Sequence, residues 1–288
     1  MISTRLEETL RHGIGWVISG LIVLAIGGVF LLPYLWVAAS SFKSQFDIFS
    51  DISPLQWSAF LPTKPTTANY FSLMQRRPIL GALLNSAAVS LCQVVLTLML
   101  CSMAAYALTR IGFRGANVVF VLILVTFLLP IEALMVPLYQ VVSGFGLQDT
   151  LVGVLIPWIA SPFGLFQLRQ AFEELPKELE DAARIDGAGH VRIFLSIILP
   201  NVKAPLATLA LVTFLFSWNS FLWPLVIVQS PKRQLIQVAI AQSVSPGEFP
   251  NWGETFAGAT LATVPLLLLF LFLQKYFVRG MVMSGIKG

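Results

Sequence analysis

The chain has 288 residues, of which 57% are hydrophobic and 11% charged, with a mean hydropathy of +0.82 and a formal net charge of +4. Soluble domains carry about 25% charged residues, so this composition excludes an ordinary soluble domain and predicts an integral membrane protein. The sequence has no basic stripe interleaved with aromatic residues, so nucleic acid is not an expected partner.

Uncharged or nearly uncharged apolar runs predict the architecture. A helix needs roughly 20 apolar residues to cross a bilayer, because backbone groups cannot be left unpaired in lipid. Six runs meet this condition, at about 14–39, 79–109, 116–140, 150–171, 204–229 and 255–277. We therefore expect an all-α membrane protein with six transmembrane helices in a single domain covering residues 1–288.

The distribution of basic residues predicts the orientation. If the chain crosses the membrane six times, 12 of the 18 Lys and Arg residues lie on the same side as the two termini. Cytoplasmic connections carry such an excess, so we expect both termini to be cytoplasmic. The first run is longer than a signal-peptide core of about 7–15 residues, and we expect it to stay as the first span.

The second run carries a polar stripe. Four polar residues recur there at roughly helical spacing, namely Asn85, Ser86, Ser90 and Gln93. The stripe is expected to face either a solute pathway or a partner subunit, and Asn85 is a candidate residue of that pathway.

Two prolines and one acid distinguish the third run. Pro130 and Pro137 predict a bent helix, because each removes a backbone donor and clashes with the preceding turn. Glu132 is the only acidic residue inside the predicted spans. Charges there are costly and commonly functional, so Glu132 either lines the solute path or pairs with a neighbouring helix.

The connection between the fourth and fifth runs holds the densest charge run of the chain. Between Glu173 and Asp186 there are six acidic and two basic residues. A narrow apolar stripe at helical spacing predicts a helix, formed by Leu175, Leu179, Ala182 and Ile185. Gly187 and Gly189 end this helix, and a second short apolar helix closes at Pro200.

Two interpretations of this helix–glycine–helix element stay open. Helices that lie on a membrane surface usually have a cationic polar face, whereas the polar face here is acidic. This difference favours docking to a partner protein over lying on lipid.

The fifth run contains Trp218 and Asn219 near its middle. An aromatic face beside an amide suits a sugar, and packing between helices with a satisfied amide is the alternative. His12 and His190 are far apart in the sequence and lack Cys or His companions, so no metal site is expected.

The stretch from Asp181 to Pro200 resembles a family signature. Permeases of binding-protein-dependent ABC importers carry a cytoplasmic motif of E-A-A, three residues, Gly, nine residues and I-x-L-P. Asp181-Ala182-Ala183, Gly187 and the run ending at Pro200 match this spacing, with Asp181 in place of the usual glutamate. TTANY at 66–70 and SWNSFLWPL at 217–225 further resemble the six-helix, MalG-like permease of maltose-type carbohydrate importers.

The resemblance implies that segment 173–200 couples this chain to an ATPase. Each permease of the family inserts its signature helix into a cleft on an ATPase subunit. The implied coupling residues are Glu178, Glu180, Asp181, Ala182, Ala183, Asp186, Gly187 and Pro200. Either Asp181 or Glu180 makes the main acidic contact.

The resemblance also implies the partners. These are a second, MalF-like permease, two ATPase subunits, an external solute-binding protein and the lipid of the bacterial cytoplasmic (inner) membrane. The chain has no GxxxxGK[ST] phosphate loop, so it is expected to be a non-enzymatic subunit that binds no cofactor, with ATP and Mg used by the ATPase.

The expected solute is a sugar or a sugar-like molecule. Relatives within the family carry glycerol phosphate, glycerophosphodiesters or osmolyte glycosides, and these stay open as alternatives. A stand-alone secondary transporter or channel is disfavoured, because only Glu132 offers ion coupling and the charged helix would have no role.

Overall fold

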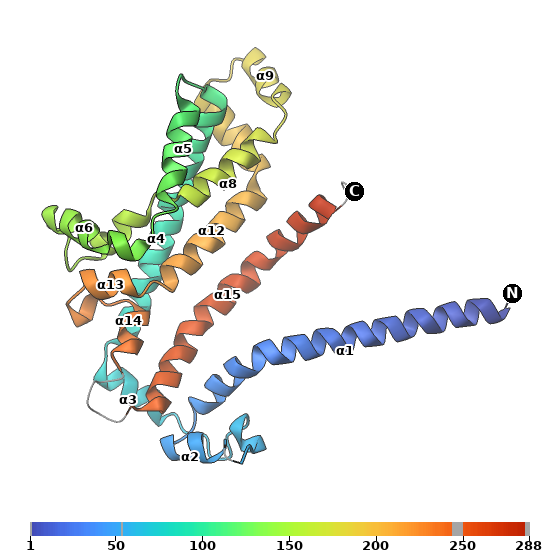
Figure 1. The fold of residues 1–288 in the computed structure, drawn as a ribbon, viewed down its shortest axis with the longest axis vertical. Coiled ribbons are helices and arrows are strands. Elements are labelled where there is room, and N and C mark those ends of the chain that lie inside the picture. The colour runs from blue at the N-terminus through green and yellow to red at the C-terminus, as the bar shows by residue number, and fades with distance from the viewer. Residues whose placement is uncertain (1, 53, 244–249, 286–288) are drawn as a thin grey trace. The chain divides into compact units, whose positions relative to one another are not determined.

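The computed structural model describes residues 2–52, 54–243 and 250–285, and their side chains at 16 and over 18–52, 54–243 and 250–272 (Figure 1). The described residues form helices and turns and include no strand, so the predicted all-α class is confirmed. The chain divides into two compact units, one built from 1–76 and 243–261, the other from 77–242 and 262–288. Because α15 (Trp252–Gly285) contributes to both units, the single domain stays a prediction.

Unit 1 contains one long apolar helix and a set of short ones. Helix α1 (Ile2–Ser40) presents almost all its apolar side chains to the surroundings from Trp16 onward. The connection after it forms α2 (Gln45–Ser50), the 3-10 turn η1 (Trp57–Ala59) and α3 (Ala68–Arg76). The sequence leaves the structure of the external connection over 40–78 open, and the structure shows these short helices there.

Buried polar contacts hold this connection in place. Lys43 Nζ lies 2.9 Å from Asp51 Oδ2, and this contact lowers the pKa of Asp51, with a further hydrogen bond from Ser58. The Asn69 amide donates to the backbone carbonyls of Ser41 and Lys43, each at 2.8 Å. These polar contacts therefore hold the segment after α1 in a defined conformation within unit 1.

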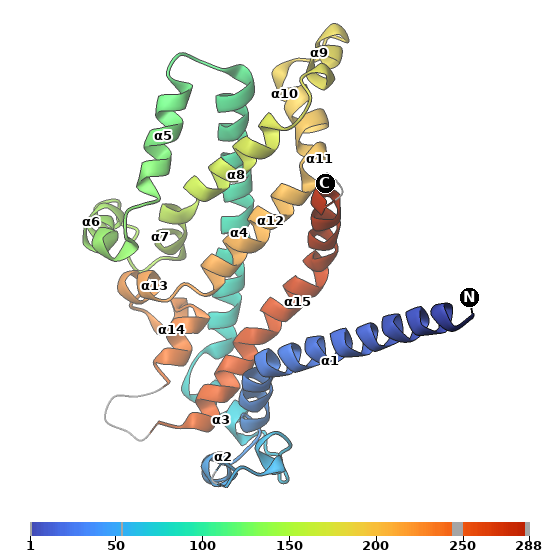
Figure 2. The ribbon, with the colours of Figure 1, turned by 45° about the vertical axis from the view of Figure 1, so that its right-hand side comes forward.

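Three helices form the centre of unit 2. Helices α4 (Ile79–Tyr106), α8 (Pro162–Glu173) and α12 (Lys203–Trp218) pack against one another, and α5 (Ala116–Thr126) packs on α8 (Figures 1 and 2). Close packing depends on Gly164 of α8. A Cβ atom there would lie 2.8 Å from Leu209 Cδ1 and 3.2 Å from Cys101 Sγ.

Candidate membrane spans are of two kinds. Three straight segments are long and apolar enough, at Ile18–Ser40, Ile79–Ile111 and Trp252–Phe272. Three further helix pairs pass the same test together but are bent by 103°, 45° and 80°. The described residues therefore contain three such spans, or up to six if each bent pair is one span. The six-span count and the cytoplasmic termini stay predictions.

The predicted bend of the third run lies at Pro130. Pro130 is extended, with ψ of 132°, and precedes α6 (Ile131–Gly144), which turns by 103° from α5 (Figure 2). Pro137 lies inside α6 without ending it. The helix expected over 116–140 is thus two helices, because Pro130 cannot donate a backbone hydrogen bond and disfavours helix at the residue before it.

Two other expected spans are interrupted. The run at 150–171 forms α7 (Leu151–Leu155) and the 3-10 turn η3 (Ile156–Trp158) before α8 begins. In the run at 204–229, α12 ends at Trp218, although we expected one continuous helix. Pro224 has no N–H to donate to Ser220, and the chain resumes as α13 (Leu222–Ile227). The turn η5 (Pro231–Arg233) and α14 (Ile236–Ala241) follow.

The predicted helix–glycine–helix element is present. Its first helix is α9 (Glu178–Ile185). The second is a helical run of α10 (His190–Ile193), the π-helical turn η4 (Phe194–Ile198) and α11 (Leu199–Asn201). Pro200 lies in the last turn of this run instead of closing it, and the chain then bends by 80° into α12. A second π-helical turn, η2 (Ala107–Ile111), follows α4.

Candidate functional site

Helix α9 ends in a turn that requires glycine. Gly187 has a φ of +80°, its N–H donates to the Arg184 carbonyl, and the Ala188 N–H donates to the Ala183 carbonyl at 2.9 Å. This pair of bonds is the Schellman motif, in which glycine takes the left-handed position without steric cost. The sharp turn predicted at Gly187 is therefore present.

One side of α9 is exposed, and we call it the outer face. It consists of Glu178, Leu179, Asp181, Ala182 and Ile185, residues that recur at helical spacing. Ile185 is 87% exposed, and the Asp181 side chain is 66% exposed. Asp186 and Gly187 extend the exposed surface beyond the helix. A short helix that shows apolar and acidic side chains together has the character of a docking surface.

The opposite side of α9 is fixed by Arg110. Arg110 Nε lies 2.9 Å from Glu180 Oε1, and both side chains are only 4% exposed. Arg110 Nη2 also donates to the backbone carbonyls of Phe172 and, at 2.8 Å, Leu175. We call these contacts the Arg110 network. It connects η2, which directly follows α4, with the end of α8 and with α9.

The network satisfies groups that would otherwise be unpaired. The last carbonyls of a helix have no partner within it, and an arginine near that end also interacts favourably with the helix dipole. Arg110 supplies both effects at the end of α8. Its charge is in turn balanced by Glu180, as a buried charge requires.

The two alanines of the signature face different ways. Ala182 is exposed, whereas Ala183 is partly buried against the chain's own core, which includes Phe172 and Ile193. We expected both alanines to let a partner approach closely. Only Ala182 is placed to do so, and Ala183 instead lets α9 lie close to this chain. Pro200 is exposed at the end of the second helix.

The C-terminal end of α4 also contacts the second helix of the helix–glycine–helix element. The Tyr106 hydroxyl lies 3.3 Å from Nδ1 of His190, the first residue of α10. The Tyr106 ring further packs against Phe194, with centroids 5.2 Å apart. The segment from Tyr106 to Arg110 therefore contacts both helices of the element.

A cavity of about 360 Å³ lies elsewhere in unit 2, between α6, η3, α12 and α13. Its lining is mostly aromatic and aliphatic, with two polar side chains and no charged residue: Ile131, Met135, Leu138, Trp158, Phe216, Asn219, Ser220, Phe221, Leu222 and Trp223. Such a composition, apolar with a few polar groups, is typical of small-molecule sites. Among the described residues, no group of three or more His, Cys, Asp or Glu could hold a metal ion.

The predicted pathway residues divide between cavity and core. Asn219 lines the cavity, and its amide donates to the Leu215 carbonyl at 2.9 Å. Trp218 is only 1% exposed and donates to the Ala262 carbonyl at 3.0 Å, which favours the packing alternative. Glu132 is exposed in the first turn of α6 beside the cavity residue Ile131, without lining the cavity itself.

The aromatic wall of the cavity was not predicted. Trp158 packs edge-on against Phe216 and Trp223, with centroids 5.8 and 6.5 Å apart. From the sequence alone, both tryptophans are more simply interfacial anchors or packing residues. The available signal was their position beside Pro157 and Pro224, where helices break and side chains can turn inward.

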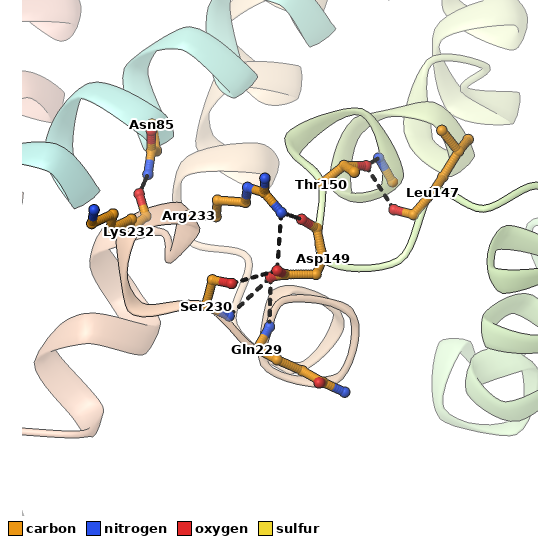
Figure 3. A network of polar contacts seen from close by, with 9 residues as sticks. Asn85, Leu147, Asp149, Thr150, Gln229, Ser230, Lys232 and Arg233 are labelled. Atoms are coloured by element: carbon orange, nitrogen blue, oxygen red, sulfur yellow. Dashed lines mark hydrogen bonds and ion pairs between the residues drawn. The ribbon is translucent and has the colours of Figure 1, made fainter.

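The polar stripe of α4 contacts other segments of the same chain, and Figure 3 shows the bond from Asn85 to Lys232. The Asn85 amide donates to the carbonyls of Lys232 and Gln234, at 2.9 and 3.1 Å. Ser86 Oγ accepts from the Ile236 N–H, and Gln93 donates to the Trp158 carbonyl. The stripe thus contacts backbone groups of its own chain, and the pathway role of Asn85 stays a prediction.

Asp149 fixes the same loop from the other side (Figure 3). Its carboxylate accepts from the N–H groups of Gln229 and Ser230, from the Ser230 hydroxyl and from Arg233 Nη1. The Ser230 hydrogen bonds, foremost that of its hydroxyl, lower the pKa of Asp149 to about 2. Asp149 also has a φ of +53°, a left-handed conformation that Asp tolerates better than most residues.

Comparison with known proteins gives the same family as the signature. The chain is 40% identical over 205 residues to the arabinooligosaccharides transport system permease AraQ of Halalkalibacterium halodurans, covering 71% of this chain and 73% of that protein. It is 36% identical over 203 residues to the sn-glycerol-3-phosphate transport system permease UgpE of Pectobacterium atrosepticum, covering 70% and 72%.

A solved structure has the same fold. A chain of a bacterial ABC transporter involved in the import of the acidic polysaccharide alginate superposes with a TM-score of 0.79 at 21% identity, covering 93% of this chain and 98% of that one. Residues 97–283 match the family described as "Binding-protein-dependent transport system inner membrane component". That segment contains α9, Gly187 and the cavity, and the chain belongs to this family of ABC importer permeases.

Proposed function

We propose that this chain forms half of the translocation pathway of an ABC importer for a sugar or sugar-like solute, and that ATP hydrolysis on a separate subunit drives it through α9. The observation that carries the proposal is the two-sidedness of α9. Its outer face exposes Leu179, Asp181 and Ile185, while its inner face is fixed to α4 and α8 through Arg110. A helix held in this way can bind a partner and pass on its displacement.

The outer face fits a cleft on an ATPase subunit. Ile185 and Leu179 supply apolar area whose burial is favourable at about 25 cal/mol per Å². Asp181 supplies an exposed carboxylate that can pair with a basic side chain of the partner. ATP and Mg bind to that partner, and this chain contributes the mechanical connection. The same class implies a second, MalF-like permease, a second ATPase subunit, an external binding protein and the bacterial inner membrane.

The cavity favours a sugar over a phosphorylated solute. Trp158, Phe216 and Trp223 offer apolar faces for the C–H side of a sugar ring, and Asn219 offers a side-chain amide. A phosphate group would call for Lys or Arg, and the cavity lining contains neither. Glycerol phosphate stays the alternative solute, because the permease of that name is among the relatives.

Reconstitution tests the proposal directly. The chain is placed in proteoliposomes with the second permease, the ATPase subunits and the binding protein, and ATP-dependent uptake is measured. We expect Asp181→Arg to abolish solute-stimulated ATP hydrolysis, whereas Glu174→Gln, a change at an exposed carboxylate at the end of α8, has no effect. Uptake at the full rate without ATPase subunits would establish a stand-alone transporter or channel instead.

The solute is identified in a second experiment. The binding protein is screened for ligands, and uptake of arabino-oligosaccharides, lactose and sn-glycerol-3-phosphate is compared in the same proteoliposomes. We expect a neutral sugar to be carried. Selective uptake of the phosphorylated compound would favour the alternative.

A further inference from the structure

We infer that Arg110 is a positioning residue that transmits the displacement of α9 to the membrane helices α4 and α8. This inference rests on the proposed function and names the element within the chain that carries its coupling. Arg110 itself contacts neither solute nor nucleotide in this scheme. It acts through Glu180 and the backbone at the end of α8.

The contacts of Arg110 join three elements through one side chain. Its Nε faces Glu180 of α9 at 2.9 Å, and its Nη2 donates to the carbonyls of Phe172 and Leu175. Phe172 belongs to α8, and Leu175 lies in the connection between α8 and α9. Arg110 thus restrains the start of α9, the connection before it and the helix from which that connection leaves.

The Arg110–Glu180 pair is buried, and its attraction is that of an ion pair. Both side chains are 4% exposed, so solvent screens their attraction less than that of a surface pair. The other ion pairs of the described part of unit 2 either lie within one helix, as Arg169–Glu173 and Arg184–Asp181 do, or join the distant loops of Asp149 and Arg233. Among those pairs, Arg110–Glu180 alone connects α9 to another element.

Geometry explains why this position holds arginine. The guanidinium presents several donors in a fixed planar fork, whereas lysine is a compact point charge on a flexible stem. Two carbonyls accept from Arg110 Nη2, and the Glu180 carboxylate lies beside Nε as an ion pair. The π-helical turn η2 that contains Arg110 is itself a local departure from regular helix, of the kind that is frequent at functional sites.

A second contact restrains the far side of the glycine turn. Tyr106, one turn before Arg110, reaches His190 at the start of α10. The C-terminal end of α4 and the turn η2 therefore contact the helix–glycine–helix element both before and after Gly187. A displacement of α9 is passed to α4 and α8 instead of being absorbed by the connection at 174–177 or by the turn.

The test separates transmission from docking. Complexes carrying Arg110→Gln, Glu180→Gln or both changes are reconstituted, and solute uptake and ATP hydrolysis are measured on the same vesicles. We expect the double variant to retain the ATPase subunits and basal hydrolysis, because it leaves no buried charge unpaired. The number of solute molecules carried per ATP should fall on the order of tenfold in Arg110→Gln. Since the two residues act as a unit, the double variant should lose no more than Arg110→Gln alone.

The double variant also covers a failure to fold. Arg110→Gln leaves Glu180 buried without its partner, which can prevent assembly, whereas the double variant leaves no unpaired charge. An uncoupled but assembled double variant supports the inference even when the single variant does not assemble. An assembled double variant with the wild-type ratio of solute to ATP overturns it.

Matched controls exclude a general effect of charge. Arg114→Gln and Glu174→Gln remove an exposed arginine of the same loop and an exposed carboxylate at the end of α8, and the ratio should not change. If the wild-type complex shows no ATP-dependent uptake, the proposed function itself fails. If the wild type transports and Arg110→Gln assembles with an unchanged ratio, only the inference fails.

Discussion

Glu180 and Asp181 are adjacent in the sequence and face opposite sides of α9. The Glu180 side chain is 4% exposed and pairs with Arg110, whereas the Asp181 side chain is 66% exposed and has only a loose contact, of 3.8 Å, with Arg184. The signature position that usually holds glutamate is filled by Asp181. This arrangement favours Asp181 as the acid offered to a partner and assigns Glu180 to the chain's own structure.

Substitution of the two acids should therefore have opposite consequences. We expect Glu180→Ala to lower the free energy of unfolding by about 3–5 kcal/mol, because it leaves the Arg110 charge buried without a partner. Asp181→Ala should change it by less than about 0.5 kcal/mol, as is usual at exposed sites, and should weaken binding of the ATPase subunit. Thermal unfolding in detergent and copurification with the ATPase measure the two effects. Equal destabilisation by both substitutions would contradict the assignment.

Gly187 offers a test of the turn itself. Nothing lies within 4 Å of a Cβ atom built at Gly187 or at Gly189, but only Gly187 has a positive φ. We expect Gly187→Ala to cost about 1 kcal/mol of stability through backbone strain alone. Gly189→Ala is the matched control and should be nearly neutral. Equal unfolding temperatures for the two variants would argue against a left-handed turn at Gly187.

The sequence predicted what depends on local pattern. The signature spacing located α9 and the turn at Gly187, and the Pro130 pattern located the bend before α6. What it did not predict depends on contacts between distant segments. The sequence does not distinguish Arg110 from the other basic residues that indicate the orientation. Nothing in the neighbouring sequence indicates that α8 and α9 contact this arginine.

The polar stripe of α4 shows the same limit. Periodicity shows that Asn85, Ser86 and Gln93 share a face, but it does not say what that face contacts. The partners are backbone groups of the loops at 158 and 232–236, which return to α4 only because the fourth and fifth runs are broken. A prediction of unbroken spans therefore leaves such a stripe without a partner inside the chain.

Asp149 should make stability depend on pH in acid. Its pKa is lowered in the folded protein from 3.8 to about 2, so its contribution to stability is complete above the unfolded value and is lost as the pH falls through the folded one. We expect Asp149→Asn to lower the unfolding temperature by a constant amount between about pH 7 and 5. The difference from the wild type should shrink below pH 3.8 and be lost as the pH falls through about 2. Glu174→Gln is the control, and a difference that grows in acid would contradict the sign.

Two buried glycines should differ in their tolerance of alanine. A Cβ atom at Gly153 would lie 2.1 Å from the backbone oxygen of Leu147, which cannot move without disturbing the turn before Thr150. At Gly164 the nearest atom is the flexible end of Leu209, at 2.8 Å. We expect Gly153→Ala to cost at least about 1–3 kcal/mol and Gly164→Ala clearly less, by the usual cost of overpacking. Chemical denaturation in detergent measures both costs. The reverse order would contradict the close approach of Gly153 to the backbone of Leu147.

The neighbours Trp218 and Asn219 separate solute contact from packing. Asn219 lines the cavity, and its replacement by alanine removes one hydrogen bond to a solute, so we expect the KM of uptake to rise about two- to tenfold with basal ATP hydrolysis unchanged. Trp218 donates to the Ala262 carbonyl inside the core, so Trp218→Phe should remove this hydrogen bond and cost about 0.5–1.5 kcal/mol of stability without changing KM.

The direction of the Trp218 indole makes this pair of variants decisive. The two side chains are adjacent in sequence, and any general loosening of the end of α12 would affect both quantities in both variants. A rise in KM confined to Asn219→Ala, with a loss of stability confined to Trp218→Phe, can arise only if the solute passes on the cavity side of α12. A rise in KM in Trp218→Phe alone would instead place the solute against the face from which the indole donates to Ala262.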